Sequence, residues 1–416
     1  MSCGADARGD RIARVKAHRL RVNFGGMQIA GAFANLGIPH YTAGALTALR
    51  EGGLWAVDGV ADDAVARTYR APDLDWVDTM TPRSAFGGGG LGGALRRGLS
   101  AWRSESIRAR PDAEYLPHPF AKPLGAPRAP TLLCCFDLFV VDAPEKYGRH
   151  LESRRAHYAE SVALADAIVV PFPRTFRLLP SVFPAAHGKL FRTACPTLLG
   201  DVPLREDVVR SVAARFRPDP TKPLVLYPSA LHHHKNHVGL AEAAALLIER
   251  GHRVTFVCPG SEHSPETTEP IRAAIRSFEM DEHVRLPGFL RSDEVRALYE
   301  ICDLAISPSR AEGGNAIVQE AIHFGRPVAC AGIEAAREHV KAMGAEVPFF
   351  DPDDPRDMAR AVEEVLQDPG RHVAANARAR ETIRSWTWRR LAQRYAEILD
   401  WLVQGADPGK RPPAEA

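Results

Sequence analysis

The segment from residue 304 to residue 331 restricts the possible folds more than any other part of this chain. It begins with the apolar run Leu304-Ala305-Ile306, continues through a turn and a helical stretch that ends at Gly325, and finishes with a second apolar run, 327–331. Short apolar runs bounded by turn residues predict buried strands, and glycine commonly ends a helix. Two buried strands joined by a helix form a βαβ unit of a parallel sheet, whose ligands bind at the carboxyl ends of the strands.

The turn in this unit has the features of an anion site. Gly313 and Gly314 let the backbone approach a ligand closely. The helix that begins near Asn315 and Ala316 points unpaired N–H groups and the positive end of its dipole toward that ligand. Glu320 lies one turn further along the same helix, so its carboxylate reaches hydroxyl groups next to the anion. A phosphate group with neighbouring hydroxyls describes a nucleotide sugar.

Two glutamates, Glu312 and Glu320, flank this turn. Taken singly, Glu312 could be an ordinary charge on an exposed loop and Glu320 an ordinary exposed residue of a helix. A pair of glycines is also common in ordinary turns. Their combination at the carboxyl edge of a predicted parallel sheet favours a binding site over a solvated surface.

The rest of the second half repeats the alternation of strands and helices. The expected strands are 224–227, 254–257, 284–286 and 304–306, and the expected helices are 238–250, 271–278 and 293–300, the last with Ser292 as its cap. Strands that alternate with helices predict a doubly wound parallel sheet. We therefore expect a nucleotide-sugar-binding, Rossmann-like domain over residues 206–385.

The first half shows the same alternation less clearly. The expected strands are 20–24, 131–136 and 167–170, the expected helices are 41–50 and 151–165, and the Pro- and Gly-rich stretch 71–130 stays unassigned. We expect an N-terminal, acceptor-side domain over residues 1–205 that faces the other domain across a cleft, with 196–223 as the crossover. An apolar stripe at helical spacing from Trp386 to Leu402 predicts that 386–405 completes a domain, while 406–416 has little to bury and is expected to be disordered.

Composition narrows the class of protein. The 416 residues include 53 basic and 51 acidic side chains, a balance that argues against a nucleic-acid binder acting through bulk charge. No apolar run is long enough to span a membrane, the N-terminus lacks the apolar stretch of a signal peptide, and we expect a cytoplasmic protein. The seven scattered cysteines predict reduced core thiols.

Three consecutive histidines, His232 to His234, precede Lys235 at the start of the helix 238–250. Consecutive side chains diverge on an extended or turning chain, and no acidic or cysteine partner stands at ligand spacing, so we expect no metal site here. Lys235 would lie at a helix N-terminus on the same sheet edge as Glu312, where it would complement a diphosphate as a point charge. The alternative is an ordinary surface lysine.

Three other patterns are weaker. The glycine run 87–93 matches GxGxxG formally, but no strand precedes it, so a flexible loop is the better interpretation. Asp73 and Asp75 form a DxD pair of a kind that arises easily by chance. Leucines and arginines between residues 91 and 110 predict an amphipathic helix, which we expect to pack on its own domain rather than on an anionic membrane.

Taken together, these motifs resemble the retaining GT-B glycosyltransferases of family four, the glycosyl transferases group 1. The run AEGGNAIVQEAIHFGRPVACAGI is similar to the family signature with two glutamates eight positions apart, and PSALHHHKN is similar to its phosphate-binding segment. GIPHYTAGALTAL resembles the N-terminal turn that closes over the donor, LLCCFDLFVVDAPEKYGRH resembles the "HDL…PE" segment, and RSWTWRRLAQRYAEIL resembles the helix that returns to the N-terminal domain.

The resemblance implies an α/β fold of the GT-B type, with two Rossmann-like domains and a returning C-terminal helix. It implies a retaining, metal-independent sugar transfer from a nucleoside diphosphate sugar, used as co-substrate with no further cofactor, to an acceptor hydroxyl. Catalysis would rest on Glu312, Lys235 and Asp137. The implied donor-binding residues are Gly37, His234, Lys235, Glu312, Gly313, Gly314, Asn315, Ala316 and Glu320.

Two positions depart from the family pattern. The family's arginine, five positions before the lysine, is Ala230, so one diphosphate contact is missing unless a histidine of the 232–234 run supplies it. The histidine of the "HD" pair is Phe136, although Asp137 remains. These departures keep a non-catalytic nucleotide-sugar sensor or scaffold open as an alternative, and a nucleotide-sugar epimerase shares the architecture. The acceptor, a small molecule, a glycan or a lipid-linked sugar, is not identified by the sequence.

Overall fold

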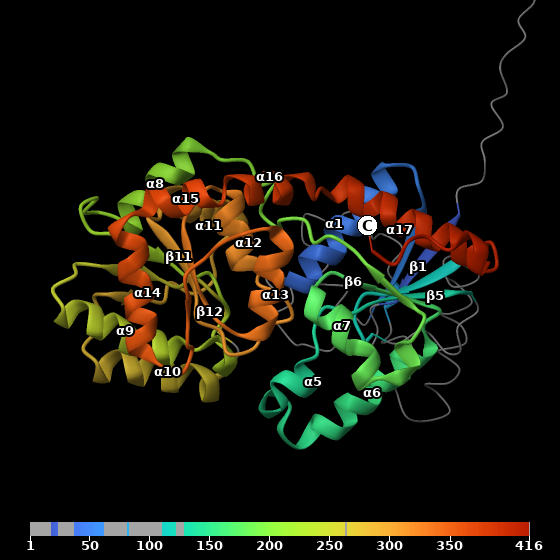
Figure 1. Ribbon diagram of the computed structural model, residues 1–416, viewed down its shortest axis with the longest axis horizontal. Helices are drawn as coiled ribbons and strands as arrows, with labels where there is room; N and C mark the ends of the chain where they lie inside the picture. Colours follow the sequence, from blue (N-terminus) through green and yellow to red (C-terminus); the bar gives the residue numbers. More distant parts are fainter. Residues whose placement is uncertain are drawn as a thin grey trace, which may run out of the picture.

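The computed structural model describes residues 18–23, 37–61, 81–82, 110–121, 129–262 and 264–415. Within these ranges the chain forms two parallel sheets, one in each half, with helices packed on their faces (Figure 1). The pairing between neighbouring strands is parallel in both sheets, as the alternating pattern predicts.

The N-terminal sheet has the strand order β3-β2-β1-β4-β5-β6-β7. Its strands are β1 (Arg19–Asn23), β2 (Ala56–Ala61), β3 (Thr81–Pro82), β4 (Ala113–Leu116), β5 (Thr131–Cys134), β6 (Ala167–Val170) and β7 (Leu190–Arg192). Its helices are α1 (Gly37–Glu51), α5 (Phe139–Asp142), α6 (Leu151–Leu164) and α7 (Pro173–Val182), with the 3-10 turns η5 (Pro144–Lys146), η6 (Gly148–His150) and η7 (Pro184–Ala186). β4, in the stretch left unassigned above, lies between β1 and β5 in the sheet.

The C-terminal sheet has the order β10-β9-β8-β11-β12-β13. Its strands are β8 (Leu224–Leu226), β9 (Thr255–Val257), β10 (Val284–Arg285), β11 (Leu304–Ser307), β12 (Val328–Ala331) and β13 (Phe349–Phe350). Its helices are α8 (Glu206–Phe216), α9 (His237–Glu249), α10 (Pro265–Ser277), α11 (Ser292–Ile301), α12 (Ala316–His323), α13 (Glu334–Met343), α14 (Pro355–Gln367), α15 (Pro369–Ala375) and α16 (Ala377–Ser385), with the 3-10 turn η8 (His233–Lys235).

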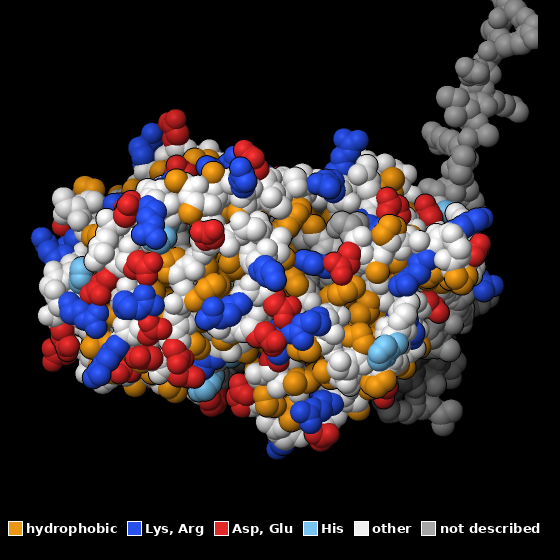
Figure 2. Space-filling view, viewed as in Figure 1, with side chains coloured by type: hydrophobic (Ala, Val, Ile, Leu, Met, Phe, Trp, Pro, Cys, Tyr) orange, Lys and Arg blue, Asp and Glu red, His pale blue; other side chains and the backbone are white. Residues whose placement is uncertain are grey.

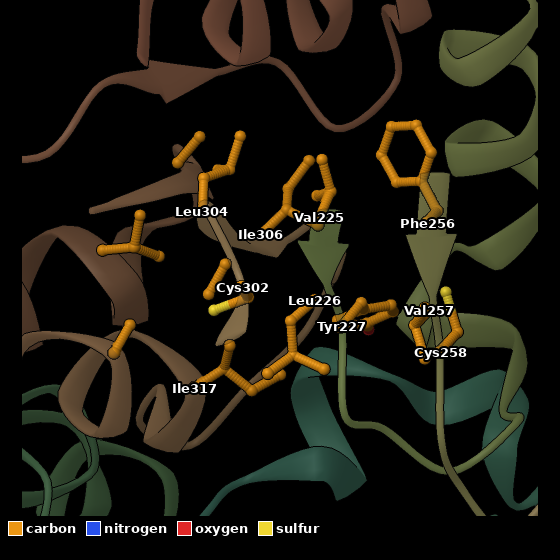
Figure 3. Close-up of a cluster of buried hydrophobic side chains, with 14 of the residues drawn as sticks. Val225, Leu226, Tyr227, Phe256, Val257, Cys258, Cys302, Leu304, Ile306 and Ile317 are labelled. Carbon is orange, nitrogen blue, oxygen red and sulfur yellow. The ribbon is translucent and has the colours of Figure 1, made fainter. Parts of the chain in front are cut away.

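The core of this second unit forms because side chains alternate between the two faces of the central strands. Val225 and Leu226 point to opposite sides of β8, and Phe256 and Val257 do the same on β9 (Figure 3). Each of these four side chains is fully buried. A strand that is buried on both faces reads as a continuous apolar run, which is why the sequence located these strands well.

The last long helix, α17 (Trp388–Val403), returns to the N-terminal unit, as predicted. It runs across the molecule from α16 and packs against α1 (Figure 1). Tyr395 lies with its hydroxyl 3.3 Å from that of Tyr41, and Trp55 donates a hydrogen bond of 3.1 Å to Asp400. The apolar stripe of α17 is therefore part of the core of the N-terminal unit.

Several element boundaries differ from the expected ones. α11 begins at Ser292 itself, with Arg291 at the N-cap position donating its N–H to the carboxylate of Glu294, and α10 begins at Pro265, one turn or more before the apolar periodicity starts. The expected crossover 196–223 contains the helix α8, whose apolar face packs toward α11. Polar or proline-containing first turns hide the starts of these helices from a search for apolar periodicity.

The C-terminal tail, the surface charges and the cysteines can be compared with the expectations from the sequence. The tail 406–416, which the sequence predicts to be disordered, is described up to Glu415. The N–H of Arg192 donates to the carbonyl of Ala414 in this tail at 2.6 Å. The disorder of the tail stays a prediction. On the face shown in Figure 2, basic and acidic side chains are interspersed, in keeping with their near-equal numbers. Six cysteines in the described ranges are buried and unpaired, as predicted. The described helices include none long and apolar enough to cross a membrane.

Three of the weaker sequence patterns fall outside the described residues. These are the glycine run 87–93, the pair Asp73 and Asp75, and the amphipathic stretch 91–109.

Candidate functional site

The turn after β11 is fixed by one buried side chain, Asn315. Its carbonyl oxygen accepts a hydrogen bond from the N–H of Val318 and caps α12, and its amide nitrogen donates to the hydroxyl of Ser307 at 2.9 Å. The same nitrogen lies 3.3 Å from the Cys330 sulfur at the end of β12. Asn315 therefore joins the start of the helix to the carboxyl ends of two strands, which holds the turn rigidly in place.

The N–H groups around this turn are not all available to a ligand. The N–H of Asn315 donates to Nδ1 of buried His339 at 2.9 Å. Burial lowers the pKa of His339 to about 4, so the ring is neutral and accepts this bond. The N–H groups of Gly313, Gly314 and Ala316 make no hydrogen bond to any residue in the described ranges. Three of the four predicted backbone donors thus keep their capacity to bind an anion.

Lys235 and Glu312, which the sequence assigns to the same sheet edge, lie in direct contact. The ammonium of Lys235 is 2.5 Å from a carboxylate oxygen of Glu312, and both side chains are largely buried. The hydroxyl of Tyr227 donates to the carbonyl of Lys235 at 2.8 Å, which fixes the backbone of the lysine. Both members of the pair are strong hydrogen-bonding groups. On binding of a ligand, the ammonium can donate to a phosphate instead, and the carboxylate can accept from sugar hydroxyls instead.

The loop that carries Lys235 is held by an unusual backbone conformation at Asn236. This residue has a φ of 60°, in the left-handed region that asparagine tolerates better than most residues. Its side-chain amide donates to the carbonyls of Pro308 at 3.1 Å and Pro352 at 2.7 Å. Asn236 therefore ties the start of α9 to the turn after β11, and both halves of the charge pair depend on that connection.

Glu320 is buried inside the C-terminal unit rather than exposed on its helix. It is 7% exposed, and the hydroxyl of Tyr299 donates to one of its carboxylate oxygens at 2.9 Å. Burial raises the pKa of Glu320 to about 7, and the hydrogen bond from Tyr299 works against that rise. Near pH 7 this carboxyl is therefore partly protonated. In its ionised form, and with its orientation fixed, it can accept hydrogen bonds from two neighbouring hydroxyls.

The N-terminal wall contributes the segment after β5. Asp137 is buried, and one of its oxygens accepts hydrogen bonds from the N–H of Phe139 and from the hydroxyl of Tyr158, each at 3.1 Å. Phe136 packs edge-on against Tyr41, with 4.8 Å between ring centroids. The wall is thus apolar at position 136 and acidic at position 137, and one carboxylate oxygen of Asp137 has a structural role. Its catalytic role stays a prediction.

Gly313 and Gly314 have a function that the sequence did not reveal. A Cβ on Gly313 would overlap the carbonyl oxygen of Phe136, and a Cβ on Gly314 would overlap the ring of Phe172. Both clashes lie across the boundary between the two units. The glycine pair therefore lets the turn after β11 come into contact with the N-terminal wall, in addition to leaving its backbone open to a ligand.

Gly37 and His234 are placed differently from one another. Gly37 begins α1, and a Cβ there would make an ordinary contact of 3.5 Å with Leu198, so no steric need for glycine exists in this arrangement.

Buried His234 packs its ring 5.2 Å from that of Phe139 on the opposite wall, and its carbonyl accepts from the N–H of Arg310. Burial and the charge of Lys235 lower the pKa of His234, so the ring is neutral. The predicted roles of both residues at a diphosphate stay predictions.

Ion pairs between the two units lie beside this site, and sequence reasoning missed them. Arg174 on α7 contacts Glu334 on α13 at 2.7 Å and, within its own unit, Asp142 at 2.6 Å. Arg177, one turn further on, contacts Glu334 at 2.7 Å and Glu338 at 2.5 Å. Figure 1 shows α7 and α13 next to each other where the two units meet. Two arginines three residues apart on one helix and two glutamates four residues apart on another are a signal only once the helices are known to be neighbours.

A metal site has no support from the His232–His234 run. Among the residues that the structure describes, no three histidine, cysteine or acidic side chains are grouped so that they could share a metal ion.

Sequence comparison agrees with this geometry. Residues 211–382 match the profile of the family described as Glycosyl transferases group 1. The C-terminal unit belongs to the glycosyl transferases group 1 family. The matched range contains α9, the charge pair, α12 and Glu320, so the family assignment covers the site residues of that unit.

Curated relatives resemble the chain over part of its length. A D-inositol 3-phosphate glycosyltransferase from Thermobispora bispora is 30% identical over 166 residues, 39% of either chain. A 2-deoxystreptamine glucosyltransferase from Streptomyces kanamyceticus is 28% identical over 161 residues, 38% of this chain and 40% of that protein. The matches thus span about two fifths of the length of these relatives.

Solved glycosyltransferase structures resemble nearly the whole chain in fold. The structure of Anabaena HepE in complex with UDP and glucose superposes with a TM-score of 0.70 at 15% identity, covering 93% of this chain and 100% of that one. Sucrose-phosphate synthase from Thermosynechococcus elongatus gives a TM-score of 0.68 at 15% identity, with coverage of 93% and 100%. At this identity the likeness concerns the fold alone, and it confirms the predicted GT-B architecture.

Proposed function

We propose that this protein transfers a sugar from a nucleoside diphosphate sugar to an acceptor hydroxyl, with retention at the anomeric carbon. The observation that carries the proposal is the arrangement at one sheet edge of Lys235, Glu312 and unpaired N–H groups at the start of α12, with Glu320 one turn behind them. Membership of the C-terminal unit in glycosyl transferases group 1 supports the same activity.

Each group then has a role that follows from its chemistry. Breaking the bond between the sugar and the diphosphate leaves negative charge on the leaving phosphate, which preorganised donors stabilise. Lys235 and the N–H groups of Gly313, Gly314 and Ala316 would supply those donors. Glu312 would release Lys235 and accept hydrogen bonds from the transferred sugar, where its charge would also favour positive charge at the anomeric carbon.

The remaining residues would hold the two ends of the reaction. Glu320 would accept hydrogen bonds from the ribose hydroxyls, and its burial beside Tyr299 fixes its direction. Asp137 would face the acceptor from the other wall, through the oxygen that Tyr158 and Phe139 leave unused. Gly37, at the start of α1, would let the N-terminal turn approach the diphosphate.

Incubation with UDP-, GDP-, ADP- and dTDP-sugars tests the proposal, because one of them should bind and slowly release its diphosphate. D-inositol 3-phosphate and 2-deoxystreptamine, named in the descriptions of two relatives, are reasonable first acceptors. Product anomers resolved by NMR would establish retention. Binding of none of the donors would refute the proposed activity.

The reaction as proposed needs no divalent cation, because Lys235 and backbone N–H groups would neutralise the diphosphate. Turnover should therefore persist in excess EDTA. Activity that disappears in EDTA and returns only with Mg²⁺ or Mn²⁺ would contradict this part of the proposal.

A non-catalytic nucleotide-sugar sensor is the second candidate. Two observations favour it: Phe136 places an apolar ring where the family has a histidine, and Lys235 is neutralised by Glu312. A sensor would bind one donor tightly without hydrolysis or transfer, and Glu312→Gln would leave that binding unaltered. Release of diphosphate that falls in Glu312→Gln would exclude the sensor.

A further inference from the structure

The proposed diphosphate site is short of positive charge within its own unit. Lys235 is paired with Glu312, which neutralises its charge, and position 230 is an uncharged alanine. The neighbouring His234 has its pKa lowered by burial and is neutral. A diphosphate carries charge on both phosphates, so binding it between one lysine and backbone N–H groups would leave part of its charge uncompensated.

Lys146, at the end of η5 in the opposite wall, is placed to supply the missing charge. Its ammonium lies 4.4 Å from the ring centroid of Phe139. The same ring packs against that of His234, with 5.2 Å between the centroids, and His234 immediately precedes Lys235. One aromatic ring therefore separates the ammonium of Lys146 from the segment that carries Lys235.

Lys146 has no competing partner in the described part of the chain. The residue is exposed at the surface, but surrounding protein atoms reduce the solvation of its ammonium, and no carboxylate among the described residues lies within ion-pair distance of it. The structural alternative is a cation that only rests on the faces of Phe139 and Tyr147, an interaction worth about 0.5–1 kcal/mol at an exposed position. Such a contact leaves the three N–H donors of the ammonium free for an anion.

Electrostatics connect this lysine to both walls. Desolvation lowers the pKa of Lys146. The negative charges of Asp137 and Glu312 raise this pKa, and the positive charge of Lys235 lowers it. The charge of Lys235 thus acts on the ammonium of Lys146 from across the boundary between the two units. An anion between them would replace this repulsion by two attractions.

We propose that Lys146 is the second cation of the donor-diphosphate site, supplied by the N-terminal wall opposite Lys235. This inference rests on the proposed function and assigns the diphosphate a residue from each unit. Because its two cations come from opposite walls, the diphosphate draws the two units together as it binds. The ion pairs between α7 and α13 would hold the same closed arrangement from outside the site.

The test compares Lys146→Met, which removes the charge, with Lys146→Arg, which keeps it. Lys341→Met, on the exposed surface of α13, is the matched control. Isothermal titration of the full chain with UDP, GDP, ADP and dTDP identifies the diphosphate that the wild type binds. The same titration is then made with that diphosphate and with its parent nucleoside.

We expect Lys146→Met to weaken the diphosphate by about 10-fold or more, the size of a lost charge-assisted hydrogen bond. The parent nucleoside should bind both proteins equally, Lys146→Arg should recover most of the affinity, and Lys341→Met should leave it unchanged. X-ray scattering should show compaction on addition of the diphosphate in the wild type and less of it in Lys146→Met.

Three results would overturn the inference. Equal diphosphate affinity of Lys146→Met and the wild type would show that the lysine does not touch the donor. Unchanged donor affinity with a raised KM for a phosphorylated acceptor would place it at the acceptor instead. An equal loss of nucleoside and diphosphate binding would indicate a structural effect. If the wild type binds none of the diphosphates, it is the proposed function that fails.

Discussion

Replacing Glu320 by glutamine separates the cost of burying this carboxyl from its use in binding. Glu320 is 7% exposed and accepts a hydrogen bond from Tyr299. Glutamine has the same shape, and its carbonyl oxygen can accept the same bond, but it never ionises. The substitution therefore removes the charge and leaves the packing of α12 in place.

The expected magnitude follows from the pKa of Glu320, which burial raises from 4.5 to about 7. Below pH 4.5 the carboxyl is neutral in the folded and unfolded states, so its burial costs nothing through ionisation. Between pH 4.5 and 7 only the unfolded state ionises, and the wild type loses stability as the pH rises. Above pH 7 the loss is complete at about 3 kcal/mol, from 1.36 kcal/mol for each unit of pKa.

Thermal unfolding of both proteins at pH 5.5 and pH 8.5 measures this effect. The advantage of Glu320→Gln over the wild type should grow by about 2 kcal/mol between the two pH values. For a domain of this size that is an increase in the difference in Tm on the order of 4–8 °C. Glu242→Gln, on the exposed face of α9, is the matched control and should show no such growth.

Donor binding should change in the opposite direction. An ionised carboxylate accepts hydrogen bonds from hydroxyls better than a carboxyl or an amide does, so the wild type should bind donor more weakly below pH 7. Glu320→Gln should bind donor about 10-fold more weakly than the wild type at pH 8.5, with little dependence on pH. A stability difference that stays the same at both pH values would refute the burial argument, whether or not donor binds.

Three further predictions concern the surroundings of the site. Glu312→Gln frees Lys235 from its ion pair, so nucleoside diphosphate affinity measured by calorimetry should hold or rise while sugar transfer falls on the order of 100-fold; weaker diphosphate binding would contradict the assigned roles. Arg177→Ala removes exposed contacts to Glu334 and Glu338 and should cost less than about 1 kcal/mol in urea unfolding, with a smaller cost at high salt. Asn236→Ala should cost about 2–4 kcal/mol because it loses two hydrogen bonds and strains a positive φ, whereas Asn236→Gly should cost about 1 kcal/mol less; equal losses would argue against backbone strain.

The placement of Lys235 and Glu312 at one sheet edge was predictable because both residues are close in sequence to the strands that position them. Lys235 and Glu312 each follow a continuous apolar strand, and parallel strands bring their carboxyl ends to one edge. Their direct pairing at 2.5 Å was not predictable, since spacing along the chain says nothing about which charges meet across a turn. Nor was the burial of Glu320, because a helix face looks the same in sequence whether solvent or Tyr299 covers it.

The other wall was less accessible to sequence reasoning for physical reasons. β4 is only four residues long and lies in a stretch rich in proline and glycine, so its apolar pattern is too short to distinguish from a loop. Lys146 belongs to a 3-10 turn, which has no apolar periodicity to mark it in the sequence. Its proposed role depends on its position beside Phe139 and His234, which come from different units. Contacts of this kind are set by the packing of the two units.

The return of α17 to the N-terminal unit has a consequence for folding during synthesis. Leu391, Tyr395, Ile398 and Leu399 are buried against the N-terminal sheet and α1, so that core lacks part of its apolar lining until residues near 400 have left the ribosome. The C-terminal sheet, formed by residues 224–350, can complete its own core before then. We therefore expect the half that is translated second to become stable first, leaving the nascent N-terminal half dependent on chaperones during that interval.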